Sequence, residues 1–340
     1  MGKALGQLAR RLGRFIPAQA LRHVGGPAAM FFHGVEHQTL DGRVQLNHHD
    51  AAMFARIAGT LRRDFDVRPL SDIDRVLADP NAHRRAVFLM SDDGYANTLT
   101  VAADLLEGLP WTLFVSSAHI GTGLPSPVFL ARLFYLYAPA GPYRLPHLAP
   151  LRLADAAQRQ AAAGPGIDAL RALPAEQAKE SVAAMRAAFS GDALQRLLAR
   201  FTSEHFLDWD GVRALKARGV EIGAHADTHW PMHEKQSDAW LVQQTTGARA
   251  RIEAETGPCR FFAYPFGNTP DIGPKAWRAV EAAGFSHAFT TLSGSLSAGG
   301  NRFLLPRYGI GLGDTHLASL VPLLGAGNRR LRAFQQRLAG

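Results

Sequence analysis

Two histidines and two adjacent carboxylates are the residues of this chain whose types and spacing favour metal chemistry. His225 and His229 are separated by Ala-Asp-Thr, and Asp92 and Asp93 stand together well upstream, just before a glycine. Two imidazoles and one carboxylate form a three-ligand shell for a divalent ion with an open position, as hydrolytic sites require. The second carboxylate would then be free to take a proton from water.

Each fragment also has a reading without chemistry. Histidines at this spacing occur by chance on surfaces and in cores, and Asp-Asp-Gly suits a tight turn. Their positions favour the metal site, because the carboxylates follow the apolar run 86–90 and the histidines follow the run 220–224. Both runs are typical of buried strands, and functional residues gather at the carboxyl ends of such strands in α/β folds.

Three motifs, in the same order, resemble those of the polysaccharide deacetylases (carbohydrate esterase family four, the NodB homology domain). The Thr-Phe-Asp-Asp-Gly motif of that family stands here as residues 90–94, and its His-Ser/Thr-x-x-His motif as residues 225–229. Its aromatic-Pro-aromatic-Gly turn stands as residues 262–267. The likeness extends from about Met30 to Ile310 and covers most of the chain.

The resemblance implies a role for each of the four residues. Asp93, His225 and His229 would hold a divalent metal, and Asp92 would be the base that takes the proton of the attacking water. Zinc is the usual ion for such a set, and nickel, cobalt and iron are alternatives. The competing reading of Asp92 is a turn residue or a helix N-cap.

Hydrolysis of an amide also needs a general acid for the leaving amine. Many family members use a late Leu-x-His motif, but Thr-His-Leu at 315–317 has the wrong order. Another branch carries an early Tyr-His motif, which Phe32-His33 resembles. We therefore predict His33 as the acid and His37 as the second candidate. A histidine that only makes structural hydrogen bonds is the alternative for His33.

The third motif departs from the family. The arginine that pairs with the base usually stands two residues before the proline, where this chain has Ala263. A buried Asp92 still needs a positive partner, or its pKa would rise. Arg307 follows the last predicted strand and is our candidate, with Arg260 as the alternative; each can equally be an ordinary ion-pair arginine.

Four further residues are predicted to contact the substrate. Tyr264, Pro265 and Phe266 would shape the wall of a groove, and the backbone amide of Tyr95 would stabilise the oxyanion.

The elements that must position these residues alternate along the chain. Alternating strands and helices predict a parallel α/β sheet or barrel, and the resemblance implies an irregular (β/α) barrel with fewer than eight units. The predicted strands are 28–32, 67–70, 86–90, 112–115, 221–224, 260–264 and 288–291. The predicted helices are 50–65, 72–77 (capped by Ser71), 97–106, 210–219, 237–255 and 274–283.

One stretch, at about 137–206, breaks this alternation. It is rich in Ala, Leu, Arg, Pro and Gln, and it predicts helices separated by proline and glycine breaks. We interpret it as a helical insertion beside the barrel mouth. The predicted organisation is a basic amphipathic segment at 1–25, the deacetylase-like barrel at 26–320 and a basic tail at 321–340.

Composition limits the class of protein. A chain of 340 residues with 47% apolar and 19% charged residues is ordinary for a folded protein. Its single cysteine, Cys259, excludes an internal disulfide and a multi-cysteine metal site.

The net charge of +8 is concentrated toward the two ends of the chain. Solvated basic helices are one reading, and contact with an anionic membrane or glycan is the other, because residues 1–25 also carry an apolar stripe. Without a nucleic-acid reading motif, we expect no nucleic-acid partner. The stripe consists of Leu5, Leu8, Leu12 and Ile16.

Membrane and targeting signals are also absent from the sequence pattern. There is no run of about 18 apolar residues, and the first residues lack the apolar core of a secretory signal. We therefore expect a cytoplasmic protein, with peripheral attachment to the inner membrane as a further expectation.

Together these features predict a metal-dependent hydrolase that removes an N-acetyl or other N-acyl group from an amino sugar, in a glycan or a lipid-linked saccharide. An O-acetyl esterase and a deformylase of a lipid-linked sugar would use the same site. A glycan-binding protein without turnover is the alternative from another class. Departures such as Ser91 and Ala226 favour it, but a binding protein needs no base beside a metal.

Overall fold

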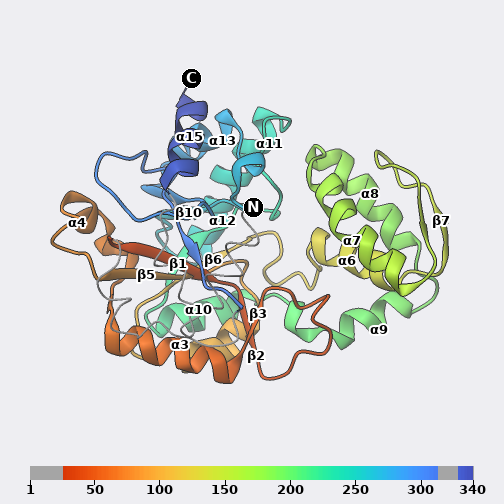
Figure 1. Cartoon of the computed structure of the whole chain (residues 1–340), viewed down its shortest axis with the longest axis horizontal. Coiled ribbons are helices and arrows are strands. Elements are labelled where there is room, and N and C mark those ends of the chain that lie inside the picture. The colour runs from red at the N-terminus through yellow and green to blue at the C-terminus, as the bar shows by residue number, and fades with distance from the viewer. Residues whose placement is uncertain (1–25, 313–327, 340) are drawn as a thin grey trace.

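The structure is a computed structural model that describes residues 26–312 and 328–339 (Figure 1). The predicted amphipathic segment 1–25 lies outside the described residues. No helix in the described ranges is both long enough and apolar enough to span a lipid bilayer.

A parallel sheet of eight strands forms the centre of the molecule. The sheet and its surrounding helices make a half-barrel (Figure 1), which confirms the predicted irregular barrel. The strand order is β11 (His287–Phe289), β10 (Phe261–Ala263), β9 (Glu221–Ala224), β6 (Thr112–Val115), β5 (Ala86–Ser91), β1 (Ala28–Phe32) and β12 (Tyr308–Gly309), and β4 (Asp66–Val67) also pairs with β5.

The strands are apolar on both faces because both faces are covered. All six residues of β5 are buried, as expected for a parallel strand between two layers. Alternate residues divide between two cores: Leu89 and Leu113 face the helices, and Phe88 and Phe114 face the inner cluster. The covering helices are α3 (Ala51–Asp64), α4 (Ile73–Ala78), α10 (Trp209–Ala217), α12 (Ala248–Thr256) and α13 (Pro274–Ala282).

Two predicted helices are irregular. The predicted helix 97–106 consists of a π-helical turn, Thr98–Ala102, followed by α5 (Ala103–Leu105). The predicted helix 237–255 contains α11 (Asp238–Val242), a π-helical turn at Gln243–Gly247, and then α12.

The region around Ser71 corrects two predictions. Strand β4 ends at Val67 instead of residue 70, because a 3-10 turn begins at Leu70. Ser71 lies inside that turn and does not cap α4, which begins after Asp72 without a side-chain cap. The amides of Leu70 and Ser71 donate instead to the Glu221 carboxylate at 2.5 and 3.1 Å.

One pair of strands was not predicted from the sequence, because its residues are largely polar. β2 (Gly34–Glu36) pairs in parallel with β3 (His48–Asp50). The close approach explains Gly34, since a Cβ there would lie 1.9 Å from His48 Nδ1. His48 in turn lies 2.9 Å from Glu204 Oε1 in a buried pair.

The helical insertion forms a lobe beside the half-barrel, on the right of Figure 1. It begins about ten residues earlier than predicted, because α6 (Pro127–Tyr137) packs against α7 and α8. It also contains an antiparallel hairpin that the sequence analysis missed, β7 (Gly141–Tyr143) with β8 (Leu151–Leu153). Its other helices are α7 (Ala156–Arg171), α8 (Ala175–Ala187) and α9 (Ala193–Arg200), followed by a 3-10 turn at Thr202–Glu204.

One proline of the insertion does not separate two helices, because α7 continues through Pro165. Gly166 has a packing reason: a Cβ there would lie 2.1 Å from the Tyr135 hydroxyl of α6.

The C-terminal region is partly a packed helix instead of a separate basic tail. Helix α15 (Asn328–Ala339) buries Phe334 and Leu338. Gln335 Nε2 donates to the Leu304 carbonyl at 3.2 Å, which ties the helix to the segment before β12.

Candidate active site

The site lies where neighbouring strands end. Asp92 and Asp93 follow β5 directly, and His225 follows β9. Strand β6 pairs with both β5 and β9, so the two motifs meet although about 130 residues separate them. His33 follows β1, whose Phe32 is in register with Ser91 of β5.

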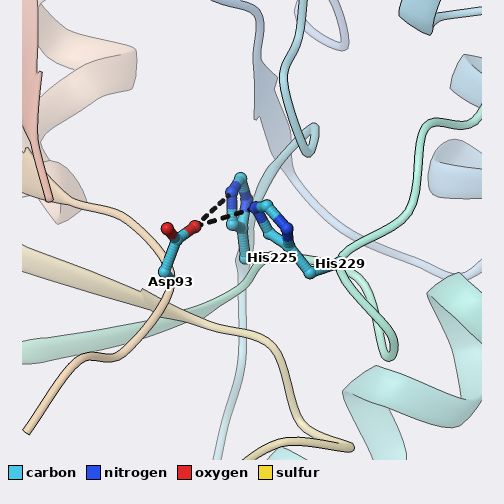
Figure 2. A group of neighbouring side chains, drawn as sticks. All are labelled: Asp93, His225 and His229. Atoms are coloured by element: carbon cyan, nitrogen blue, oxygen red, sulfur yellow. Dashed lines mark ion pairs between the residues drawn. The ribbon is translucent and has the colours of Figure 1, made fainter. Parts of the chain in front are cut away.

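Asp93, His225 and His229 form a compact triad, and Figure 2 shows their side chains turned toward one another. Asp93 Oδ1 lies 3.2 Å from His225 Nε2 and 2.9 Å from His229 Nε2. One donor atom from each residue lies within 4.8 Å of the others. Asp93 and His225 are buried, and His229 is partly accessible, so the open side of the triad is at His229.

The donor set fits a divalent cation. His225 Nδ1 lies 2.7 Å from the Ala263 carbonyl and donates its proton there, which leaves Nε2 as a lone-pair donor facing the triad. Asp93 Oδ1 is buried, and no donor in the described chain meets it with the geometry of a hydrogen bond. With both imidazoles in their neutral form, these lone-pair donors converge on one point, and such a set suits a metal ion.

The charges of the triad residues shift one another's pKa values. Burial raises the pKa of Asp93, but His229 and His225 outweigh burial and hold it well below its usual value. Burial lowers the pKa of His225, but the charges of Asp92 and Asp93 outweigh it, and the pKa is raised. At His225, the negative charges of the two carboxylates therefore have a larger effect on the pKa than burial has.

Arg307 holds Asp92 through a buried bidentate ion pair. The two guanidinium nitrogens donate to Asp92 Oδ1 and Oδ2 at 2.7 and 2.8 Å. Arg307 is 0% exposed, donates from Nε to the Thr290 carbonyl, and lies 4.4 Å from the ring centre of Phe31. Burial raises the pKa of Asp92, but Arg307 outweighs burial and lowers it. Arg260, the alternative, is exposed over Phe261.

Asp92 stands beside the triad without belonging to it. Its Oδ2 lies 4.0 Å from His225 Nε2, against 3.2 Å for Asp93 Oδ1. The structure thus separates the two neighbouring carboxylates: one faces the imidazoles, and the other faces the arginine.

His33 lies close enough to the two carboxylates and the two histidines of the motifs for their charges to shift its pKa. Burial lowers its pKa, the carboxylates of Asp93 and Asp92 oppose that shift, and His225 and His229 add to it. A lowered pKa favours the neutral imidazole, so His33 must first take up a proton before it can act as a general acid. His37, the second candidate, is exposed in the loop after β2.

Tyr95 lies two residues after Asp93, and its side chain is close to that carboxylate. Its ring stacks on Phe206, with ring centres 5.3 Å apart, in an isolated antiparallel bridge. The two hydrogen bonds of that bridge join neighbouring residues, so the N–H of Tyr95 is not used by the bridge. Burial, followed by the charge of Asp93, raises the pKa of the Tyr95 hydroxyl well above its usual value.

The third motif contributes one side chain to the site instead of the predicted three. Tyr264 is 0% exposed, and its hydroxyl donates to the Phe303 carbonyl at 3.0 Å, so it belongs to the core. Pro265 is also buried. Phe266 is half-buried, and its ring centre lies 4.9 Å from that of His229. Of these three residues, Phe266 is the one whose ring lies against a residue of the triad.

Unusual backbone conformations concentrate in the three motifs. Left-handed backbone at a non-glycine residue is strained, and such strain collects at functional sites where the surrounding structure enforces it. Four of the five such residues in the described chain belong to the motifs: Asp93 (φ 78), Ala226 (φ 58), His229 (φ 50) and Phe266 (φ 59).

Two supporting residues were not predicted from the sequence. Asp227, between the two histidines, is buried and accepts from Ser117 Oγ at 2.7 Å and from Arg251 at 2.9 Å. Arg171 of the insertion lies 3.9 Å from the ring centre of Phe266, so α7 contacts the site wall. Asp227 could have been predicted from its position between the two histidines. Nothing in the sequence pattern pointed to Arg171.

Comparison with known families identifies the chain. The family profile described as polysaccharide deacetylase matches residues 79–288. The chain belongs to the polysaccharide deacetylase family. By its family it is a carbohydrate deacetylase, and the family implies an acetylated polysaccharide as the class of substrate. His33 and Arg307 lie outside the matched range.

Solved structures of the family share the fold. The deacetylase PplD of Streptococcus pyogenes is 12% identical, with a TM-score of 0.56 over 88% of this chain and 99% of that one. IcaB from Ammonifex degensii is 14% identical, with a TM-score of 0.54 over 88% and 98%. The polysaccharide deacetylase BC0361 of Bacillus cereus is 14% identical, with a TM-score of 0.54 over 88% and 69%. No curated protein matches the chain.

Proposed function

We propose that this deacetylase is metal-dependent and removes the acetyl group from an N-acetylated amino sugar. The observation that carries the proposal is the pair of carboxylates with different partners. Asp93 faces His225 and His229, and Asp92 is held by Arg307. One carboxylate suits a ligand, and the other suits a base.

Asp93, His225 and His229 would hold the metal, and zinc is the first expectation for this ligand set. When bound, a divalent ion supplies Lewis acidity to water and to the acyl carbonyl. The tautomer of His225 is already set for this role by the Ala263 carbonyl.

Asp92 accepts the proton of the attacking water. Arg307 keeps the carboxylate ionised before the reaction and fixes its orientation through two hydrogen bonds. Water adds to the carbonyl carbon, the C–N bond breaks, and the products are acetate and the free amine.

His33 donates the proton that the departing nitrogen needs, and the Tyr95 amide donates a hydrogen bond to the oxyanion. Phe266, beside His229, forms an apolar wall for the sugar ring.

Metal content and acetate release test the proposal together. The purified protein should contain about one divalent ion per chain and release acetate from N-acetylglucosamine oligomers. His225→Ala should lose most of the metal and the activity, since only three protein ligands hold the ion. His147→Ala, on the insertion, is the control because that histidine pairs with an exposed glutamate. Full metal occupancy in His225→Ala would refute the assignment.

A second comparison tests His33. A phenolate leaves without protonation, so His33→Ala should abolish most amide hydrolysis but spare an activated aryl acetate. Equal loss on both substrates, with metal retained, would make His33 a positioning residue.

A further inference from the structure

An apolar groove lies between the insertion and the barrel, beside the proposed site. Helices α6 and α8 form one side, and residues 118–125 and 228–230 form the other. Its volume is about 390 Å³, which is within the range of small-molecule sites. The walls are alanine and proline together with Leu124, Leu130, Val182 and Trp230.

The chemistry of these walls fits a hydrocarbon chain better than a sugar. Each sugar hydroxyl loses hydrogen bonds to water on burial and needs a polar partner. The uncharged polar residues of the groove are His119 and Thr228, and the His119 ring already lies 3.3 Å from the Thr228 carbonyl. Leu124, at 52% exposed, is a large apolar side chain that an occupant would cover.

The charged residues of the groove are both cations. Lys179 and Arg186 stand seven residues apart on α8, two helical turns along the same face. No acidic residue lines the groove within the described chain. Lys179 pairs with exposed Glu176, and Arg186 is exposed without a hydrogen bond or ion pair in that part of the chain. An apolar groove with two cations complements a chain that ends in a phosphate.

One wall of the groove adjoins the site. Thr228, which lines the groove, immediately precedes His229 of the triad. A saccharide at the triad and a hydrocarbon chain in the groove can therefore belong to one molecule.

We propose that this groove binds the hydrocarbon chain of a lipid phosphate that carries the amino sugar. The inference rests on the proposed function and narrows its substrate to a lipid-linked saccharide. The sugar lies at the triad, the phosphate lies near Lys179 or Arg186, and the chain lies against Val182 and Trp230.

A matched pair of substrates tests the inference on the full-length, metal-loaded protein. The methyl and dodecyl phosphodiesters of N-acetylglucosamine 1-phosphate share the sugar and the phosphate and differ only in chain length. The KM for the dodecyl ester, measured below its critical micelle concentration, should be at least tenfold lower. Equal KM values would overturn the inference and leave the deacetylase activity in place.

A pair of variants tests whether the lower KM of the dodecyl ester depends on the groove. Ala183→Trp fills it from an exposed position, so the fold should survive. It should raise the KM of the dodecyl ester about tenfold and raise that of the methyl ester much less. Ala187→Trp is the control, because Ala187 is exposed on the same helix but does not line the groove. Equal effects of the two variants would contradict the placement.

Binding without turnover separates this inference from the proposed function. Dodecyl phosphate should bind in calorimetry, and Arg186→Ala should weaken its binding several-fold while sparing neutral dodecyl glucoside. Binding that Ala183→Trp removes, in a protein that hydrolyses neither ester, would support the groove and refute the proposed function. Binding of dodecyl phosphate that Ala183→Trp leaves unchanged would overturn the inference.

Discussion

The barrel mouth and the insertion use charge in opposite ways. At the mouth, the side chains of Arg307 and Asp92 are 0% and 2% exposed. On the insertion, Arg196 and Asp192 also form an ion pair, but their side chains are 67% and 71% exposed. The same chemical pair is therefore part of the core in one region and part of the solvated surface in the other.

The difference shows which region depends on exact charge geometry. A buried pair repays its desolvation only while both partners are present, so the loss of one is severe. An exposed pair contributes about 0–1 kcal/mol. The insertion is held instead by apolar packing, since α6 buries Phe129, Leu133 and Phe134. The barrel mouth thus holds charged side chains in fixed positions, whereas the insertion is stabilised by packing of apolar side chains.

Removal of one arginine from each region is the strongest test of this contrast. Arg307→Met should reduce the free energy of unfolding by about 3–5 kcal/mol, because it leaves Asp92 buried without a partner. Arg196→Met should change it by less than about 1 kcal/mol. Denaturant titration measures both, and similar losses in the two variants would remove the contrast.

Buried histidine at the mouth should make stability depend on pH. Burial, followed by the charges of His33 and His48, lowers the pKa of His49 to about 4. The unfolded chain takes up this proton near pH 6.5, but the folded chain does so only near pH 4. Stability present above pH 6.5 is therefore lost as the pH falls, by about 3 kcal/mol at pH 4.

The measurement compares unfolding free energies at pH 7.5 and pH 4. His49→Gln should lose about 3 kcal/mol less than the parent protein over this interval. His147→Gln, at a partly exposed position on the insertion, is the control. An unchanged pH dependence in His49→Gln would show that other groups carry it.

Asp92→Asn tests the division of labour between the adjacent carboxylates. The rate of acetate release should fall roughly hundredfold, the usual scale for a general base. The metal should remain, because Asp92 Oδ2 lies farther from His225 than Asp93 Oδ1 does. Metal loss in proportion to the rate would make Asp92 a ligand.

Packing between helices, the property that dominates the insertion, is tested at two glycines of α7. Gly166→Ala should cost about 1–3 kcal/mol, because its Cβ would overlap the Tyr135 hydroxyl. Gly164→Ala should stabilise by up to about 1 kcal/mol, since nothing lies within 4 Å of its Cβ and alanine favours the helix. Thermal unfolding measures both, and equal shifts would contradict the packing at Gly166.

The sequence predicted those parts of the fold that local pattern determines. Strands β1, β6 and β9 match their predicted bounds, because each is mostly apolar and mostly buried. The meeting of the first two motifs was also predictable, since parallel strands align their carboxyl ends.

What the sequence did not predict depends on contacts made across the fold. Ser71 fits a helix cap by type, but it lies inside a 3-10 turn, and its amide and that of Leu70 donate to Glu221 of a distant strand. Tyr264 fits a groove wall by type, but the Phe303 carbonyl draws its hydroxyl into the core. Pro165 predicts a break, yet packing against α6 keeps α7 continuous. In each case a tertiary partner overrode a local preference.

The ion pair between Asp92 and Arg307 also has a consequence for the order of folding. The two residues are 215 positions apart, and Arg307 lies just before β12, the strand that pairs with β1. During synthesis, the first half of the sheet leaves the ribosome long before the arginine exists. Until then, Asp92 must stay hydrated or protonated, so the catalytic mouth can close only after nearly the whole barrel has been made.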